Sequence, residues 1–105
     1  MAYLVLSYDR PPAGKDSAYN DKVRSWIAVS MSMKGAVSLT AYRNVWPMTP
    51  TNLVWIEFDT VEAAEAAARH PDIKATFEEL RALGATTLSM ILLEKSPYTP
   101  EPIQP

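Results

Sequence analysis

The spacing of apolar positions changes several times along the chain, and each change marks the boundary of a predicted element. Residues 2–8 are rich in β-forming residues and end before two prolines, so they predict a first strand. From Ser17 the apolar residues recur every three or four positions, which predicts an amphipathic helix that is capped by Asp16 or Ser17 and ends at Gly35. Residues 36–45 then have the composition of a second strand.

The second half of the chain repeats the alternation of strand and helix. Residues 53–59 predict a third strand, joined to the second by a hairpin-like connection that contains two prolines. Asp59 precedes Glu62 by three residues, the spacing of a capping box, and predicts the start of an alanine-rich helix. Pro71 should break this helix, because proline is tolerated in a first turn and not in a helix interior; a second piece then runs to Gly84.

Residues 86–94 predict a final strand, and this completes the order strand, helix, strand, strand, helix, strand. That order predicts an α+β, ferredoxin-like βαββαβ fold, in which a four-stranded antiparallel sheet carries its helices on one face. We therefore expect one domain over residues 1–95 and a proline-rich, extended tail over 96–105.

A sheet covered on one side leaves its other face bare, and the last strand has apolar residues on both faces. Leu88, Met90 and Leu92 share one face, whereas Ile91 and Leu93 share the other. A bare apolar sheet exceeds what a monomer usually exposes, so the sequence predicts a homodimer that packs sheet to sheet. Met90 and Leu92 are assigned to the bare face, where a charge should disrupt the dimer.

Composition narrows the range of functions. The 105 residues contain 12 acidic and 10 basic side chains, with no basic run that could neutralise phosphates, which argues against a nucleic-acid partner. The absence of cysteine excludes disulfides and thiolate sites. No apolar stretch approaches the roughly 20 residues of a membrane span, and the first apolar run is too short for a secretory signal. We expect a cytoplasmic protein without a membrane partner.

Three segments resemble a known family: GAVSLTAYRNV, then WIEFD running directly into TVEAAEAAARHPDI, and the closing LRALGATTLSMILLE. Over roughly residues 2–95 the chain resembles the dimeric α/β-barrel superfamily and, within it, the antibiotic-biosynthesis-monooxygenase-like group. The resemblance implies that two sheets close into a barrel and that a small-molecule pocket lies between each protomer's sheet and its helices. Members include cofactor-independent monooxygenases of aromatic polyketides and haem-degrading enzymes.

The haem-degrading branch can be compared residue by residue along the helix that follows the EFD strand. The position of its haem-ligating histidine falls at Phe77, and that of its helix tryptophan falls at Ala67. Phenylalanine has no lone pair for iron, so the comparison argues against haem chemistry. We expect no cofactor, and no metal, because one histidine without cysteine supplies too few ligands.

Three residues are candidates for catalysis. His70, the only histidine, could transfer protons near neutral pH, although a ring that bonds exposed carbonyls at the helix break is the favoured interpretation. Tyr42 and Arg43, followed by Asn44, could hold an anionic or enolate oxygen near a strand end. Adjacent strand residues point to opposite faces, so at most two of these three can share a site. Asp9, before Arg-Pro-Pro, is interpreted as a turn residue.

Ligand binding is assigned to aromatic and amide side chains that could line a pocket for a flat molecule. Trp26 belongs to the apolar stripe of the first helix, where core packing is the simpler explanation, whereas Trp46 beside Pro47 is free to touch a ligand or partner. The assigned residues are Trp26, Asn44, Trp46, Trp55 and Phe77. Glu57 is expected to form a cross-strand ion pair with Arg43.

The sequence thus predicts a homodimeric protein that binds a small apolar or aromatic molecule, with cofactor-independent monooxygenation of an aromatic or polyketide-like substrate as the implied reaction. The alternatives are a non-catalytic binding or assembly module and a lyase or isomerase on the same fold. A polar group that projects into an aromatic-walled cavity would favour catalysis. A cavity lined only by aliphatic residues, with His70, Tyr42, Arg43 and Asn44 in solvent, would favour binding alone.

Overall fold

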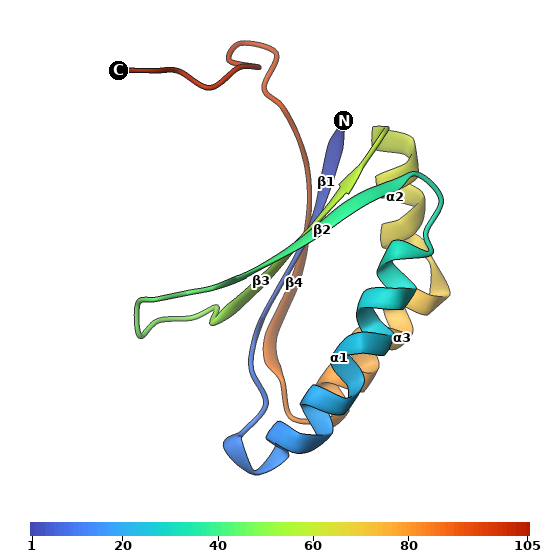
Figure 1. Cartoon of the computed structure of the whole chain (residues 1–105), viewed down its shortest axis with the longest axis vertical. Coiled ribbons are helices and arrows are strands. Elements are labelled where there is room, and N and C mark those ends of the chain that lie inside the picture. The colour runs from blue at the N-terminus through green and yellow to red at the C-terminus, as the bar shows by residue number, and fades with distance from the viewer.

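A computed structural model describes all 105 residues, with the helices gathered on one side of a twisted sheet (Figure 1). The C-terminal tail leaves β4 and runs away from the helices without forming further helix or strand. The strands are β1 (Ala2–Asp9), β2 (Ala36–Arg43), β3 (Asn52–Phe58) and β4 (Thr86–Glu94), and the helices are α1 (Asp16–Met31), α2 (Val61–Arg69) and α3 (Pro71–Ala82), with a short 3₁₀ helix (Ala13–Lys15) before α1.

The four strands form one sheet in the order β2-β3-β1-β4, and every neighbouring pair is antiparallel. β1, the most buried strand, lies inside the sheet, between β3 and β4. α1 connects β1 to β2 at one edge of the sheet, and α2 and α3 connect β3 to β4 at the other edge. The predicted ferredoxin-like α+β fold is confirmed.

The core lies between the sheet and the helices, because alternate strand residues turn to the helix side. Leu4, Ile56 and Phe58 of the sheet and Ile73 of α3 are the largest fully buried side chains. Full burial of each such side chain contributes roughly 1.5–3 kcal/mol relative to exposure. The alternation in β1 and β3 thus fixes which face of the sheet the helices cover.

The helix ends differ in detail from the sequence prediction. α1 already includes Asp16 and Ser17, and Lys15 precedes it without a side-chain cap, so neither predicted residue caps the helix. α2 is capped by Thr60, not Asp59: the Thr60 hydroxyl accepts a hydrogen bond from the Ala63 amide at 3.1 Å. Both errors are shifts of one residue, which sequence spacing alone does not resolve.

The predicted break between the two C-terminal helices is confirmed. Pro71 starts α3, and His70 lies between α2 and α3 in an extended conformation. The sequence analysis expected the His70 ring to bond carbonyls of α2, and this expectation is wrong. Its Nδ1 instead accepts a hydrogen bond from the Asp72 amide at 3.0 Å. His70 is therefore the N-cap of α3.

The turn from α1 into β2 requires glycine. Gly35 has a φ of 83°, a left-handed conformation, and a Cβ built on it would lie 2.6 Å from the Asp59 side chain. Glycine alone fits both the backbone conformation and the close approach of the segment before α2. β2 then ends at Arg43, two residues before the predicted end.

The face of the sheet opposite the helices is apolar and uncovered. The Trp55 ring contacts the Tyr3 ring, with centroids 5.7 Å apart, and the Tyr42 ring, with centroids 6.3 Å apart. Ile91 and Leu93 of β4 lie on the same face, opposite Val5 and Tyr3, and are 49% and 36% exposed.

Two predictions about strand faces are wrong. Met90 and Leu92 pair with Leu6 and Leu4 and lie on the helix side of the sheet, so Ile91 and Leu93 form the bare face of β4. β4 is apolar at every one of these positions, and its sequence alone therefore could not decide between the two faces.

The predicted ion pair between Glu57 and Arg43 is also absent. Arg43 pairs with Asn52, whereas Glu57 pairs with Ser38 at the other end of the β2–β3 ladder. Because β2 and β3 are antiparallel, Arg43 at the end of β2 lies beside the start of β3, whereas Glu57 lies near the end of β3.

We expect Thr60→Ala to lower the free energy of unfolding by about 1 kcal/mol, because it removes the side-chain acceptor at the start of α2. Thr60→Ser, which keeps a hydroxyl, should restore most of the loss, and Asp59→Asn should have a smaller effect than Thr60→Ala. Urea unfolding followed by circular dichroism measures the three variants. A larger loss in Asp59→Asn than in Thr60→Ala would contradict this assignment of the cap.

Candidate functional site

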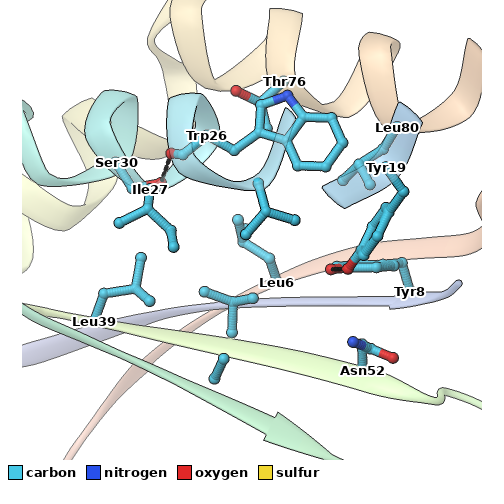
Figure 2. A pocket seen from close by; sticks show the side chains of 13 residues that line it. Leu6, Tyr8, Tyr19, Trp26, Ile27, Ser30, Leu39, Asn52, Thr76 and Leu80 are labelled. Carbon is cyan, nitrogen blue, oxygen red and sulfur yellow. Dashed lines mark hydrogen bonds between the residues drawn. The ribbon is translucent and has the colours of Figure 1, made fainter. Parts of the chain in front are cut away.

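A cavity of about 120 Å³ lies between α1 and the sheet (Figure 2). Its walls come from α1, from β1, β2 and β3, and from α3. Two of its lining residues, Ile27 on α1 and Ala41 on β2, are exposed, which places the mouth of the cavity between α1 and the edge strand β2. The remaining lining residues are Leu6, Tyr8, Tyr19, Val23, Trp26, Ser30, Leu39, Asn52, Val54, Thr76 and Leu80.

The cavity side of α1 is set by helical spacing. Tyr19, Val23, Trp26, Ile27 and Ser30 recur at intervals of three or four residues and share one face of the helix. The Ser30 hydroxyl donates to the Trp26 carbonyl at 2.9 Å and so is satisfied within the helix. The apolar face of α1, which the sequence analysis interpreted as core packing, thus also forms the wall of the cavity that lies opposite the sheet.

One end of the cavity is polar. The hydroxyls of Tyr8 on β1 and Tyr19 on α1 are hydrogen bonded to each other, and both point toward the middle of the cavity (Figure 2). Asn52 pairs with Tyr8 across β1 and β3, and its amide lies beneath the two hydroxyls with its nitrogen on the cavity side. Three hydrogen-bonding side chains from three elements therefore meet at one point.

A bulge in β4 lies beside this polar end. Between the pairs Ser7–Ser89 and Asp9–Thr86, β1 contributes one residue, Tyr8, whereas β4 contributes two. One of the two, Thr87, has a φ of 56°. Bulges bend a strand and redirect neighbouring side chains, and this one leaves the end of β1 paired regularly with β3 alone.

Burial, and then the hydrogen bond with Tyr19, raise the pKa of Tyr8 well above its ordinary value of 10.0. Nearby Asn52 opposes this rise only weakly. Tyr8 therefore stays a neutral phenol at physiological pH, and it can donate or accept a hydrogen bond but cannot act as a base.

No charged side chain lines the cavity. The nearest cation, Arg10, lies over the ring of Tyr19, with its guanidinium carbon 5.0 Å from the ring centroid, and it also faces Asp16 at 3.7 Å. Lys22 is paired with Glu79 at 2.9 Å on the outer surface. The cavity is consequently apolar along its length and polar, but uncharged, at one end.

Trp26 contributes its ring and not its N–H to the cavity. Its ring contacts Tyr19 edge to face, with centroids 5.7 Å apart, and its Nε1 is buried on the side of α3 without a hydrogen-bond partner. The tryptophan therefore forms an apolar wall of the site.

The hydrogen bond and charge of Lys22, with a smaller contribution from the nearby indole, lower the pKa of Glu79.

Most residues that the sequence analysis assigned to a site lie outside this cavity. Tyr42 is 53% exposed on the bare face of the sheet, where Trp55 contacts it. Arg43 is exposed at the end of β2, where it is the cross-strand neighbour of Asn52, and it does not line the cavity. Phe77 packs between the two groups of core residues and does not line the cavity. Only Trp26 of the assigned residues lines it.

Asn44 and Trp46 lie in the connection between β2 and β3. The Asn44 amide nitrogen donates to the Met48 carbonyl at 3.2 Å and the Pro50 carbonyl at 3.0 Å, and its oxygen accepts from the Trp46 amide at 3.0 Å. Asn44 is thus a structural residue that holds the loop, and Trp46 projects from it with 71% of its surface exposed.

His70 lies at a separate, shallow hollow that it shares with Met33, Lys34 and the alanine face of α2. It shares this hollow with no carboxylate, tyrosine or second histidine. No three histidine, cysteine, aspartate or glutamate side chains lie close enough to hold a metal ion.

Sequence reasoning missed Tyr8, Tyr19 and Asn52 as a group. Tyr8 was placed at the end of the first strand, Tyr19 in the first helix and Asn52 in the connection before the third strand, with no link between them. The only local signal was Tyr8, an aromatic residue at the end of the first strand. The alternation of side chains along that strand directs Tyr8 toward the helices. The convergence itself depends on the register between β1 and β3, which the sequence does not give.

The raised pKa of Tyr8 predicts a pH dependence of stability. Above about pH 10 the unfolded chain loses the Tyr8 proton while the folded chain keeps it, so the free energy of unfolding should fall, by up to about 1.4 kcal/mol per pH unit from this group. Tyr8→Phe should lack this part of the decline. Urea unfolding at roughly pH 9 and pH 11 measures both slopes; equal slopes would show that Tyr8 ionises normally.

Comparison with known proteins gives a likeness in structure and none in sequence. No family model matches the chain, and no curated protein matches it in sequence. A putative antibiotic biosynthesis monooxygenase from Deinococcus radiodurans superposes with a TM-score of 0.74 at 13% identity, over 99% of this chain and 97% of the other.

Two further structures share the fold. The cofactor-independent oxygenase SnoaB from Streptomyces nogalater superposes with a TM-score of 0.69 at 18% identity, over 95% of this chain and 97% of its own. A DABB family protein with a ferredoxin-like fold from Mesorhizobium loti gives 0.72 at 12% identity, over 90% and 96%. No helix of the chain is both long and apolar enough to span a membrane. The three superpositions show that the chain has the ferredoxin-like fold of the antibiotic-biosynthesis-monooxygenase-like proteins.

Proposed function

We propose that this protein binds a small, ring-sized molecule in the cavity beneath α1. The observation that carries the proposal is an apolar cavity with three convergent polar groups, from Tyr8, Tyr19 and Asn52, at one end. Such a combination is typical of ligand sites, in which apolar walls supply affinity and a few polar groups fix orientation.

The size of the cavity limits the ligand. Its volume of about 120 Å³ is well below the roughly 300–1,000 Å³ of sites for drug-sized ligands and close to the roughly 150 Å³ of cavities that hold benzene. A single ring fits this space. A polyketide with several fused rings would have to extend through the mouth between α1 and β2.

Monooxygenation without a cofactor is the reaction we propose for this site. Two proteins with the same fold are a putative antibiotic biosynthesis monooxygenase and a cofactor-independent oxygenase. No side chain of the cavity can take a proton, so the substrate would have to lose its proton to water, and the donors at the polar end could then stabilise the resulting oxyanion. A lyase or isomerase has less support, because it must also return a proton to a specific atom of the substrate, and no histidine, lysine or carboxylate lines the cavity to do so. A non-catalytic binding module is the remaining alternative.

A thermal-shift screen of single-ring phenols, cyclic ketones and larger aromatic polyketides tests the binding proposal. Single-ring compounds should raise Tm, and Ala41→Trp, which fills the mouth of the cavity, should abolish the shift. Ala28→Trp, on the exposed side of α1 outside the cavity, is the matched control. Shifts that survive in Ala41→Trp would place the ligand elsewhere.

Oxygen uptake with each hit then separates catalysis from binding. Consumption of oxygen by the wild type and not by Ala41→Trp supports a monooxygenase. Binding without oxygen uptake for any hit would leave a binding module as the function.

We also propose that a second copy of the chain covers the bare face of the sheet. Strands of seven to nine residues spaced about 4.8 Å apart give this face a flat area of about 500 Å². A standard interface buries roughly 800 Å² per partner. The loop between β2 and β3, where Val45, Trp46 and Met48 are 66–83% exposed, adds apolar surface next to Tyr42 and brings the total toward that size.

Ile91→Asp should convert a dimer into a monomer, because it places a charge within the proposed interface. Ile103→Asp, the same substitution in the exposed tail, should leave the dimer intact. Light scattering coupled to size-exclusion chromatography gives the mass of each variant. A wild-type monomer, or a dimer unaffected by Ile91→Asp, would refute the packing.

A further inference from the structure

We infer that the cavity selects an uncharged ring compound that carries a carbonyl oxygen, and that Tyr8, Tyr19 and Asn52 together donate hydrogen bonds to that oxygen. This inference rests on the proposed binding function and adds the chemical class of the ligand. It follows from counting the protons available at the polar end of the cavity.

The two tyrosine hydroxyls carry two protons between them. Their mutual hydrogen bond uses one, and the protein offers no acceptor for the other. Because both oxygens point into the cavity, the unused O–H is available there (Figure 2). A buried donor without a partner costs free energy, and a ligand acceptor would remove that cost.

Asn52 adds donors to the same point. Its Oδ1 has no hydrogen-bond partner, and its nitrogen lies on the cavity side, beneath the tyrosine pair. Its oxygen is buried away from the cavity, so it offers the ligand no acceptor. The polar end therefore presents O–H and N–H groups that no protein acceptor uses, and an oxygen acceptor on the ligand would satisfy them.

The surroundings decide the charge of that acceptor. Arg10 lies over the ring of Tyr19 and faces Asp16, and Lys22 is paired with Glu79. Arg43 is the cross-strand neighbour of Asn52, but it is exposed at the end of β2, so none of these three cations lines the cavity. A carboxylate would lose its hydration without a cation in the cavity wall, and an ammonium would lose its hydration without a carboxylate there. A carbonyl accepts two hydrogen bonds and carries no charge, which matches both constraints.

Four probes of one ring size test the inference: cyclohexanone, methylenecyclohexane, cyclohexanecarboxylate and cyclohexylammonium. Their dissociation constants are measured by NMR titration of the wild type and of Tyr19→Phe, Asn52→Leu and Tyr3→Phe. Tyr3→Phe removes a hydroxyl on the opposite face of the sheet and is the matched control for Tyr19→Phe.

Tyr19→Phe and Asn52→Leu should each weaken cyclohexanone binding by about 3- to 10-fold, the effect of one neutral hydrogen bond. The same variants should leave methylenecyclohexane, which has no oxygen, unchanged or bound more tightly. Tyr3→Phe should affect neither compound, and the two charged probes should bind at least tenfold more weakly than cyclohexanone.

The outcomes separate this inference from the function on which it rests. If cyclohexanone and methylenecyclohexane both bind and neither variant changes their ratio, the cavity binds ligands but the donor assignment is wrong. Tight binding of the carboxylate would overturn the inference on charge. If none of the four probes binds, the binding function itself fails for ring-sized molecules.

Discussion

Everything in this structure depends on the one-sided covering of the sheet. Three helices lie on one face of four strands, so the parity of each strand residue decides whether it enters the core, the cavity or the bare face. In β1 this rule sends Leu4, Leu6 and Tyr8 toward the helices and Tyr3 toward the bare face. The cavity and the proposed dimer surface are thus two consequences of one constraint, on opposite sides of the same strands.

The cavity lies where tight packing gives way to polar contact. At one end of the sheet the space beneath the helices is filled by Phe58, Ile56 and Ile73. Toward the other end, Tyr8 and Tyr19 bridge α1 and the sheet through their hydroxyls, and a cavity remains between α1 and the strands. Hydrogen-bonding groups held by neutral neighbours are well suited to orient an uncharged ligand and to stabilise an oxygen as it gains negative charge.

The sequence predicted the order of elements because each one has a strong local signal. The 3.6-residue period of α1, the proline at the start of α3 and the glycines after α1 and α3 depend on neighbours along the chain. The bare face of β4 was assigned wrongly because Met90, Ile91, Leu92 and Leu93 are all apolar, and only pairing with Leu4 and Leu6 distinguishes them. Local patterns define elements, whereas register defines faces.

The site was less predictable for the same reason. Tyr42, Arg43 and His70 carry the chemistry that catalysis needs, yet their side chains lie on the open sheet, at a strand end and between two helices. Tyr8, Tyr19 and Asn52 are separated by 11 and 33 positions in the sequence, and the antiparallel pairing of β1 with β3 and the packing of α1 bring them together. No spacing rule within one element could have found them.

The central claim is that the space bounded by Tyr8, Tyr19 and Asn52 is where this protein meets its ligand. Labelling the tyrosines with ¹³C at Cζ and adding cyclohexanone tests it directly, since each ring reports on its own surroundings. The account predicts that the signals of Tyr8 and Tyr19 shift together while those of Tyr3, Tyr42 and Tyr98 stay in place. Saturable shifts confined to Tyr3 and Tyr42, on the bare face of the sheet, would contradict it.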